Sequence, residues 1–402
     1  MKIIHTSDWH LGKNLEAASI IDEQQMFIDD FVKVVEQKNI DMVIIAGDIY
    51  DNSNPPAAAE KMFYKAIKDI SNKGERIVLI ISGNHDNPDR LAAASPLAYE
   101  QGIIIIPKPK SVASVGKCGN HKILDAGQGY LEIEINNEKA VIITMPYPSE
   151  KRLDEIIYET HEDKEMQKAY STKLGEIFNN LSKKYREDTI NLAVSHLYVI
   201  GGEKSESERN IELGGSYAVF TKDLPLKAQY IALGHLHKTQ EIIKDGCKII
   251  YSGSPLQYSK SEINYKKCYY EVDIEAGKEP ITRKIEIKNY KPIEVWKCLS
   301  IEDAISTCEK NKERDVWVYL EVKTDTYIEA EDIKTMKSLK KDILEIKPII
   351  VTEEDVEEKY FDYKEKKIEE LFEEFYLEKR GVEPKKELME LFTSIVEEGD
   401  EE

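Results

Sequence analysis

Cysteine is scarce in this chain, with only five in 402 residues. The cysteines are odd in number, widely spaced and never in Cys-x-x-Cys arrangement, which argues against both a disulfide framework and a thiolate zinc site. We therefore expect small buried side chains at these positions. They are Cys118, Cys247, Cys268, Cys298 and Cys308.

Long apolar segments are also missing. No window approaches 18 consecutive apolar residues, and Asp8 interrupts the N-terminal stretch before the apolar core of a signal peptide develops. We therefore expect a cytoplasmic protein with no membrane partner. The motif Gly-x-x-x-x-Gly-Lys-Ser/Thr is absent as well, so we expect no ATP site in this chain.

Positive charge is in short supply, since 56 Lys and Arg face 76 Asp and Glu, for a formal net charge of -20. Such a balance normally argues against nucleic-acid binding, because phosphate contacts need basic residues. However, residues 353–402 hold 20 acidic and 8 basic residues, net -12, which leaves -8 for the rest of the chain. The acidic C-terminal segment dominates the total, so nucleic-acid binding has to be judged from local features.

Apolar runs of strand length recur through the first 290 residues and predict strands buried on both faces. They cover residues 2–6, 42–46, 76–81, 140–145, 190–194 and 230–233. Helical periodicity appears over residues 22–38 and 57–72, and a hairpin is expected about Asn136-Asn137. With two further strands, CKIIYSG and KKCYYEVDI, this pattern predicts an α/β fold, a four-layer α/β/β/α sandwich over residues 1–288.

Two smaller units are expected after residue 288. Residues 289–352 alternate strand and helix patterns and predict a small α+β domain of β-α-β-α-β order with one covered face. Residues 353–402 predict a pair of helices separated by Gly381 and Pro384. Each helix carries an apolar stripe that packs either against the other or against a partner. The stripes are Ile368, Leu371, Phe372, Phe375 and Tyr376, and Leu388, Leu391, Phe392, Ile395 and Val396.

Polar side chains with metal-binding chemistry follow several of the predicted strands. Open α/β sheets bind ligands at the carboxyl ends of their strands, so we expect these side chains to meet. In LGHLHK, His235 and His237 should face the same side of an extended backbone. Each residue alone is more often structural, but so many together indicate one site. The candidate ligands are Asp8, His10, Asp48, Asn84, His196, His235 and His237.

Seven nitrogen and oxygen donors without a thiolate suit two divalent ions of the manganese or iron type better than a structural zinc ion. A pair of ions about 3.5 to 4 Å apart can hold the attacking and leaving oxygens of a phosphoryl displacement by water. Asp48, in a tight strand-end turn, is the candidate bridging carboxylate. Two such ions beside Asp8 and Asp48 leave the site about +2, which attracts a phosphodiester locally.

His85 lies next to Asn84 but outside this donor set. It is the candidate catalytic residue, which would protonate the leaving 3'-oxygen or neutralise charge in the transition state. The alternative for His85 is a structural hydrogen bond.

The motifs together resemble the metallophosphoesterases and, within them, the nucleases of DNA double-strand-break repair. The resemblance covers residues 5–262 and rests on HTSDWHLGK, GDIYDNSNPP, SGNHDNPDRL, the isolated His196, LGHLHKTQ and YSGSPLQYSKSE. It implies two Mn²⁺ ions, with Mg²⁺ or Fe²⁺ as alternatives, and a catalytic role for His85. The implied ligands of the first ion are Asp8, His10, Asp48 and His237. Those of the second ion are Asp48, Asn84, His196 and His235.

The resemblance also implies a function. We expect a metal-dependent DNA nuclease, a double-strand exonuclease and a single-strand or hairpin endonuclease. Residues 289–352 look like the family's DNA-recognising capping domain, and residues 353–402 look like the helices that dock on the coiled coil of an SMC-like ATPase. The family further implies a homodimer within a heterotetramer, active in DNA repair, recombination and replication at the nucleoid.

Three questions stay open at this point. Asp51 occupies the position where archaeal and eukaryotic relatives tend to have a histidine, and its role is undefined. Four lysines on one predicted helix face either contact phosphates or form a solvated face. They are Lys334, Lys337, Lys340 and Lys341. The alternative functions are a small-substrate phosphodiesterase or phosphatase with the same site, and a scaffold for the ATPase with structural metals.

Overall fold

The computed structural model describes residues 1–154, 163–208, 217–324 and 327–350, and a few residues of the C-terminal segment. The latter are 372, 373, 376, 384, 388, 389, 392 and 393. The chain divides into two units, Met1–Ile349 and Ile350–Glu402. The first unit contains every predicted site residue. None of the described helices combines the length and the apolar character needed to cross a membrane.

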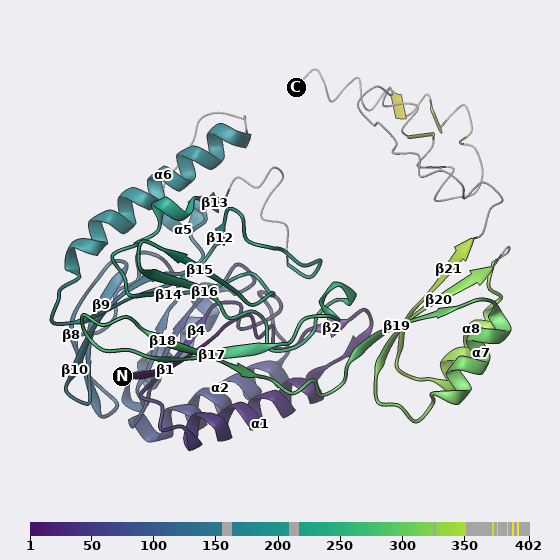
Figure 1. Ribbon diagram of the computed structural model, residues 1–402, viewed down its shortest axis with the longest axis horizontal. Helices are drawn as coiled ribbons and strands as arrows, with labels where there is room; N and C mark the ends of the chain where they lie inside the picture. Colours follow the sequence, from purple (N-terminus) through teal and green to yellow (C-terminus); the bar gives the residue numbers. More distant parts are fainter. Residues whose placement is uncertain are drawn as a thin grey trace. The chain divides into compact units, whose positions relative to one another are not determined.

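Two β-sheets form the centre of the first unit (Figure 1). The strands of the smaller sheet are β1 (Lys2–Thr6), β4 (Met42–Ala46), β5 (Ile77–Ile81), β6 (Ile103–Ile106), β17 (Cys268–Asp273) and β18 (Ile281–Glu286). Their order across the sheet is β18-β17-β1-β4-β5-β6. β1, β4, β5 and β6 run parallel, whereas β17 and β18 join antiparallel. β4 and β5 are buried along their whole length, as their continuous apolar runs predict.

The larger sheet has the order β15-β16-β14-β11-β10-β9-β8-β7. Its strands are β7 (Gly116–Cys118), β8 (His121–Gly127), β9 (Tyr130–Ile135), β10 (Glu138–Met145), β11 (Ile190–His196), β14 (Tyr230–Gly234), β15 (Gln240–Lys244) and β16 (Cys247–Tyr251). The predicted hairpin is confirmed, since β9 and β10 pair antiparallel around Asn136 and Asn137, both with positive φ. β10, β11, β14 and β16 are parallel.

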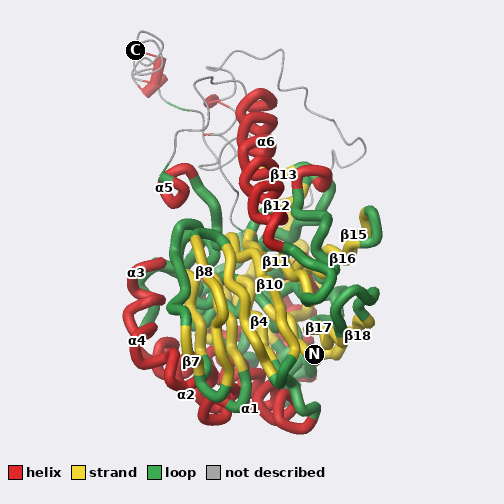
Figure 2. Tube along the Cα trace, turned by 90° about the vertical axis from the view of Figure 1, so that its left-hand side faces the viewer, coloured by secondary structure: helices red, strands yellow, loops and turns green. Residues whose placement is uncertain are grey.

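Helices cover the outer faces of both sheets, as Figure 2 shows with α6 on one side and α1 and α2 on the other. Helices α1 (Ile21–Gln37) and α2 (Ala57–Ser71) pack Phe27, Phe31 and Phe63 on the smaller sheet. Each such fully buried side chain contributes roughly 1.5 to 3 kcal/mol. Helix α6 (Asp163–Leu181) packs Leu174 and Phe178 on the larger sheet. A third apolar layer lies between the sheets, so the predicted four-layer sandwich is confirmed.

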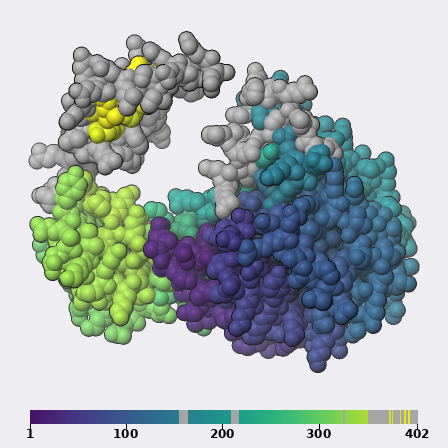
Figure 3. All heavy atoms as spheres, turned by 180° about the vertical axis from the view of Figure 1, so that it is seen from behind, coloured from purple at the N-terminus to yellow at the C-terminus, as the bar shows by residue number. Residues whose placement is uncertain are grey.

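The small domain after residue 288 has its own three-stranded sheet. Strands β19 (Ile293–Cys298), β20 (Trp317–Thr324) and β21 (Ile343–Ile350) alternate with helices α7 (Ile301–Lys310) and α8 (Ala330–Leu339). A separate apolar cluster fills it, including Trp296, Val318 and Met336. Figure 3 shows this domain in green beside the purple N-terminal segment, to which Tyr319 is linked by a hydrogen bond to Glu16. The predicted strand and helix order is therefore observed.

The predicted lysine face of α8 is wrong in part. The helix ends at Leu339, and Lys340 has an extended backbone. Its side chain is buried, where Nζ donates to the carbonyl of Arg314 at 2.6 Å and pairs with Asp342. An ammonium group that is buried and paired in this way is not available to a phosphate. Lys334, Lys337 and Lys341 are exposed.

Several smaller elements lie between these strands and helices. Two-stranded ladders pair β2 (Asn14–Leu15) with β3 (Ala18–Ser19) and β12 (Tyr198–Val199) with β13 (Ala218–Val219). Short helices are α3 (Pro88–Leu91), α4 (Ser95–Ala98) and α5 (Glu150–Leu153). All five cysteines are buried and free, as expected.

The C-terminal segment is described at a few of the predicted stripe residues. Residues 372, 376, 388 and 392 are helical. Phe372 stacks on Phe392 with ring centroids 3.9 Å apart. These two members of the stripes thus contact each other, as the internal-packing alternative predicts. The other six stripe residues lie outside the described residues.

Candidate metal centre

The seven predicted ligands come from the carboxyl ends of five parallel strands. Asp8 and His10 follow β1, Asp48 follows β4 and Asn84 follows β5, in the smaller sheet. From the larger sheet, His196 is the last residue of β11, whereas His235 and His237 follow β14. The edges of the two sheets therefore meet at one crevice. Six of the seven side chains are buried, and Asn84 is half-buried.

The turns that aim these side chains have an unusual backbone. Asp8, His10, Asp48 and His235 have φ of 54°, 44°, 51° and 105°. A positive φ costs a non-glycine residue on the order of 1 to 3 kcal/mol. The loops after β1 and β4 are joined by backbone hydrogen bonds. The amides of Asp8 and His10 donate to the carbonyls of Gly47 and Asp48, both at 3.0 Å.

Two glycines allow the strand ends to approach closely. A Cβ at Gly83 would lie 2.1 Å from the Asp48 Oδ1 atom, and a Cβ at Gly234 would lie 2.0 Å from the Ala46 carbonyl oxygen. No side chain fits at either position. Gly83 and Gly234 therefore fix how near the two motif loops come to their neighbours.

The ligand atoms form one cluster around Asp48. Its Oδ2 atom lies 3.6 Å from His10 Nε2 and 3.4 Å from His196 Nε2. Asn84 Oδ1 is 2.9 Å from His196 Nε2 and 3.2 Å from His235 Nδ1. Among the described residues, three groups have all their ligand atoms within 4.8 Å of one another. They are Asp8, His10 and His237; Asp8, Asp48 and His196; and His10, Asp51 and His85.

This donor set fits divalent cations. The separations of 3.4 and 3.6 Å from Asp48 Oδ2 to the imidazole nitrogens are longer than ordinary hydrogen bonds and suit ligand atoms that bind the same metal ion. The Nε2 atom of His235 is buried and has no hydrogen-bond partner. His10 and His237 turn their Nε2 atoms toward each other at 3.1 Å. Carboxylates, imidazoles and an amide oxygen are ligands that manganese and iron accept.

Electrostatics prepares Asp48, His10 and His235 in the protonation state that binds metal. Burial alone would raise the pKa of Asp48, but the neighbouring imidazoles of His196 and His85 outweigh it and hold the pKa well below its usual range. Burial lowers the pKa of His10 to about 3 and that of His235 well below its usual range. Ionised carboxylates and neutral imidazoles are the forms that coordinate metal ions. Burial also raises the pKa of Asp8 to about 6. Burial alone would lower the pKa of His196 and of His237, but Asp48 raises the first to about 9 and Glu262 raises the second, and both shifts favour the imidazolium form, which does not bind metal.

His85 is held at the edge of the cluster by two hydrogen bonds. Its amide donates to Asp48 Oδ1 at 2.9 Å, and its ring Nδ1 donates to the Asp51 carbonyl at 2.6 Å. Its other ring nitrogen, Nε2, lies 3.9 Å from Asp48 Oδ2 and so faces the ligands. The ring contacts His10 edge-on at 4.6 Å between centroids. The ring of His85 is therefore held with Nε2 directed toward the ligand cluster.

Asp51, whose role the sequence left open, contacts three residues in this region. Its backbone carbonyl receives the His85 bond, while its carboxylate pairs with Lys13 at 2.9 Å and lies 3.6 Å from His10 Nδ1. Burial alone would raise the pKa of Asp51, but His10 and Lys13 lower it below the usual range. Asp51 thus orients two histidines, one with its backbone and one with its side chain.

Sequence reasoning missed two residues that brace the loops. The buried carboxylate of Asp86 accepts from the amides of Ile49, Tyr50 and Gly83, so it ties two motif loops together. Asp86 lies inside the motif SGNHDNPDRL, which is the signal that could have found it. Arg152 lies outside every motif and donates to the carbonyls of Gly83 and Asp86 at 2.7 Å.

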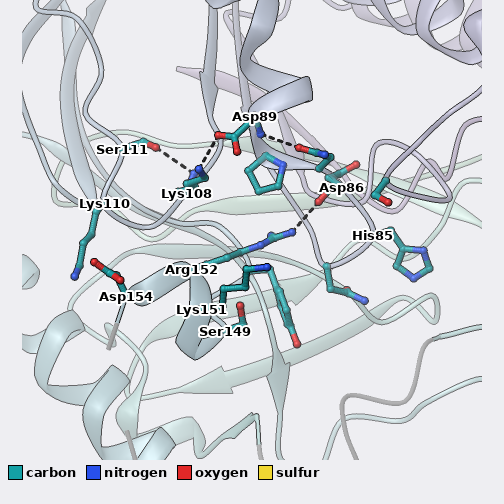
Figure 4. A pocket seen from close by; sticks show the side chains of 15 residues that line it. His85, Asp86, Asp89, Lys108, Lys110, Ser111, Ser149, Lys151, Arg152 and Asp154 are labelled. Carbon is teal, nitrogen blue, oxygen red and sulfur yellow. Dashed lines mark hydrogen bonds and ion pairs between the residues drawn. The ribbon is translucent and has the colours of Figure 1, made fainter. Parts of the chain in front are cut away.

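A hollow of about 890 Å³ opens beside His85 (Figure 4). Four cationic residues line it together with three acidic ones. The cations are Lys108, Lys110, Lys151 and Arg152, and the acids are Asp86, Asp89 and Asp154. Asp89 pairs with Lys108 at 2.6 Å, and the Asp86 carboxylate accepts hydrogen bonds from backbone amides. Charges of both signs therefore border the entrance, with a small excess of cations.

The fold and the Asp/His cluster at its strand ends agree with the family comparisons. A family model described as calcineurin-like phosphoesterase matches residues 1–239. A second model, described as Type 5 capsule protein repressor C-terminal domain, matches residues 289–380. The class of the protein is therefore that of the calcineurin-like phosphoesterases.

Curated relatives narrow the family. The SbcD subunit of the nuclease SbcCD from Bacillus subtilis is 35% identical over 404 residues, covering 100% of this chain and 99% of the relative. The protein of the same name from Staphylococcus epidermidis is 27% identical over 350 residues, covering 87% of this chain and 86% of the relative. A solved archaeal phosphodiesterase is similar at 14% identity and a TM-score of 0.31, over 71% of this chain and 100% of that chain. The chain belongs to the SbcD family of nuclease subunits.

Proposed function

We propose that this chain is the nuclease subunit of an SbcCD-type complex, a metal-dependent hydrolase of DNA phosphodiester bonds. It acts as a double-strand exonuclease and as a single-strand or hairpin endonuclease. The observation that carries the proposal is the buried cluster of carboxylates and imidazoles around Asp48, in a chain that aligns over its whole length with a relative named as a nuclease.

The proposed metal ligands divide into two sets that share Asp48. Asp8, His10, Asp48 and His237 hold one Mn²⁺; Asp48, Asn84, His196 and His235 hold the other, with Mg²⁺ or Fe²⁺ as alternative ions. The support is geometric, because Asp48 Oδ2 is close to both His10 of the first set and His196 of the second, at 3.6 and 3.4 Å. A carboxylate at that point can bridge two ions.

When bound, two divalent ions neutralise the charge of the phosphoryl group and activate water as the nucleophile. His85 supplies what the ligands do not. Its Nδ1–H bond to the Asp51 carbonyl fixes the ring, so Nε2 can donate a proton to the leaving 3'-oxygen or a hydrogen bond to a phosphoryl oxygen. Six of the seven ligand side chains are buried, so bulk water reaches the cluster only from the side of Asn84 and the hollow beside His85.

The hollow beside His85 is the proposed approach for the DNA strand. Lys151 is exposed at its rim, and Lys108 and Lys110 lie across from it (Figure 4). These cations act locally, because charges more than about 8 to 10 Å away are screened at physiological salt. The overall acidity of the chain therefore does not oppose binding of a phosphodiester here.

The remaining parts serve assembly and DNA recognition in this proposal. Residues 289–352 form a capping domain that contacts DNA, and residues 353–402 dock on the coiled coil of an SbcC-type SMC-like ATPase, which supplies the ATP dependence. The complex is a heterotetramer built on a homodimer of this chain. It works in the cytoplasm and on the nucleoid during repair.

One assay tests the proposed function. Purified protein with Mn²⁺ is mixed with an end-labelled DNA hairpin, with and without the ATPase and ATP. The expected result is metal-dependent opening of the hairpin. Hydrolysis of bis-p-nitrophenyl phosphate without DNA cleavage, even with the ATPase present, would favour a small-substrate phosphodiesterase instead.

A further inference from the structure

His237 has polar partners on both edges of its ring. Its Nε2 atom faces the proposed metal ligands and lies 3.1 Å from His10 Nε2. On the opposite edge, Nδ1 lies 2.5 Å from Ser207 Oγ and 3.6 Å from Glu262 Oε1. The partner at Nδ1 decides which nitrogen carries the proton, and hence whether Nε2 has a free lone pair.

The Ser207 hydroxyl connects His237 to Glu262. Its oxygen accepts from Nδ1–H of His237, and its proton is donated to Glu262 Oε1. In the reverse direction, Ser207 would donate to His237 and Glu262 Oε1 would keep only the longer contacts of 3.3 Å to Ser205 and 3.5 Å to Ser259. A buried carboxylate oxygen needs close donors, so the first direction is favoured. In that direction Nε2 carries the lone pair that a metal ion requires.

Glu262 is fully buried and is itself fixed by Lys267. The lysine Nζ donates to Glu262 Oε2, to Ser254 Oγ at 2.7 Å and to the His237 carbonyl at 3.1 Å. Burial alone would raise the pKa of Glu262, but Lys267 and His237 outweigh it and keep the carboxyl ionised. A buried ion pair is a poor stabilising device compared with apolar side chains of similar volume. Placement of His237 explains this pair better than stability does.

The other ligand histidines are supported in different ways. The backbone carbonyl of Ala46 accepts from His196 Nδ1 at 2.9 Å, and His10 Nδ1 has only the Asp51 carboxylate, 3.6 Å away. Among the described residues, His237 is thus the ligand histidine backed by a serine, a carboxylate and a lysine in series. A carboxylate behind a ligand histidine fixes its ring and increases its basicity.

We propose that Glu262, acting through Ser207 and held by Lys267, is a positioning residue that keeps His237 Nε2 directed at the first metal ion. The inference rests on the proposed function, because it requires that the cluster binds divalent metal. It gives a role to Glu262, the last residue of YSGSPLQYSKSE, a motif to which the proposed mechanism assigns no role. It also gives a role to Ser207, which lies outside every motif.

The test measures Mn²⁺ binding of the full-length chain by isothermal titration calorimetry, with thermal unfolding recorded in parallel. Glu262→Gln removes the charge, and Ser207→Ala breaks the connection but keeps the buried Glu262–Lys267 pair. Both variants should weaken one of two Mn²⁺ sites by about 10- to 100-fold and leave the other near the wild-type affinity. Ser207→Thr, which keeps the hydroxyl, should restore binding.

Glu206→Gln is the matched control, since Glu206 is exposed in the same loop and loses the same charge. It should bind as the wild type does. If Glu262→Gln fails to fold, the Mn²⁺ affinity of Ser207→Ala alone tests the positioning role. A folded Ser207→Ala protein with both sites within twofold of the wild type would overturn the positioning role. A wild-type chain that binds no Mn²⁺ would instead overturn the proposed function.

Discussion

The strand-end crevice and the small domain both involve parallel strands, but their buried polar side chains differ in backbone strain and in pairing. Around Asp48, carboxylates and imidazoles are buried close together on a backbone with positive φ at Asp8 and His10. In the small domain, the described residues include no non-glycine residue with positive φ, and the buried Lys340 is paired with Asp342. Strained turns and unpaired buried donors together thus mark the chemical site, while buried charges alone do not.

The largest effect is expected from a substitution at the centre of the crevice. Asp48→Asn removes the proposed bridging charge, because an amide cannot replace a carboxylate between two cations. Bound Mn²⁺, measured by elemental analysis after gel filtration, should fall from two ions per chain to at most one, and hairpin cleavage should fall below detection. Retention of both ions would show that Asp48 does not bridge them.

His85 separates chemistry from metal binding within the same crevice. In His85→Ala the ligand set is complete, so metal content should stay near the wild-type value. Cleavage should drop by about 10² or more, the usual contribution of general acid-base catalysis. The measurement is the single-turnover rate on an end-labelled hairpin at saturating Mn²⁺. An unchanged rate would remove His85 from the mechanism.

A substitution at Gly83 tests whether the close approach of the motif loops is needed for metal binding. In Gly83→Ala the new Cβ would lie 2.1 Å from Asp48 Oδ1, so the loop must shift. Urea unfolding should show a loss of about 1 to 3 kcal/mol, typical of overpacked positions, accompanied by weaker Mn²⁺ binding. Gly246→Ala is the control, because its Cβ meets nothing within 4 Å and the cost there comes from its φ of 81° alone. Equal metal affinity in both variants would contradict the predicted shift of the loop.

The smallest effect is expected in the small domain. Lys340→Met leaves the Arg314 carbonyl without its donor and Asp342 without one of its two lysine partners, so unfolding free energy should fall by about 1 to 3 kcal/mol. The exposed Lys337→Met should change stability by less than about 0.5 kcal/mol. Hairpin cleavage by the nuclease domain should be unchanged in Lys340→Met. A drop in DNA affinity for Lys340→Met at unchanged stability would restore Lys340 as a phosphate contact.

Much of the fold and of the metal centre could be predicted from the sequence. The apolar runs of β1, β4 and β14 are local signals, and the ligands follow directly after them, so both the sandwich and the crevice follow from strand periodicity. The end of α8 was missed because the two lysines after Leu339 continue the helical pattern locally. In the folded chain Lys340 is buried and its Nζ donates to the Arg314 carbonyl, and this tertiary contact overrides the local helical preference.

The supports of the site were harder to predict. Arg152 reaches the Gly83 loop from another element, and Ser207 reaches His237 across 30 positions of the sequence. A serine or an arginine in such a segment has no distinctive spacing, so only the folded chain reveals its partner. Asp86 and Glu262 lie inside recognisable motifs, yet spacing could not distinguish a ligand from a residue that holds one.

Metal content and hairpin cleavage, measured together on wild type and His85→Ala, test the central claim most directly. We expect two Mn²⁺ ions per chain in both proteins, with rapid cleavage by the wild type that EDTA abolishes and a rate lower by about 10² or more in the variant. Cleavage by the wild type that persists without any bound metal would contradict it.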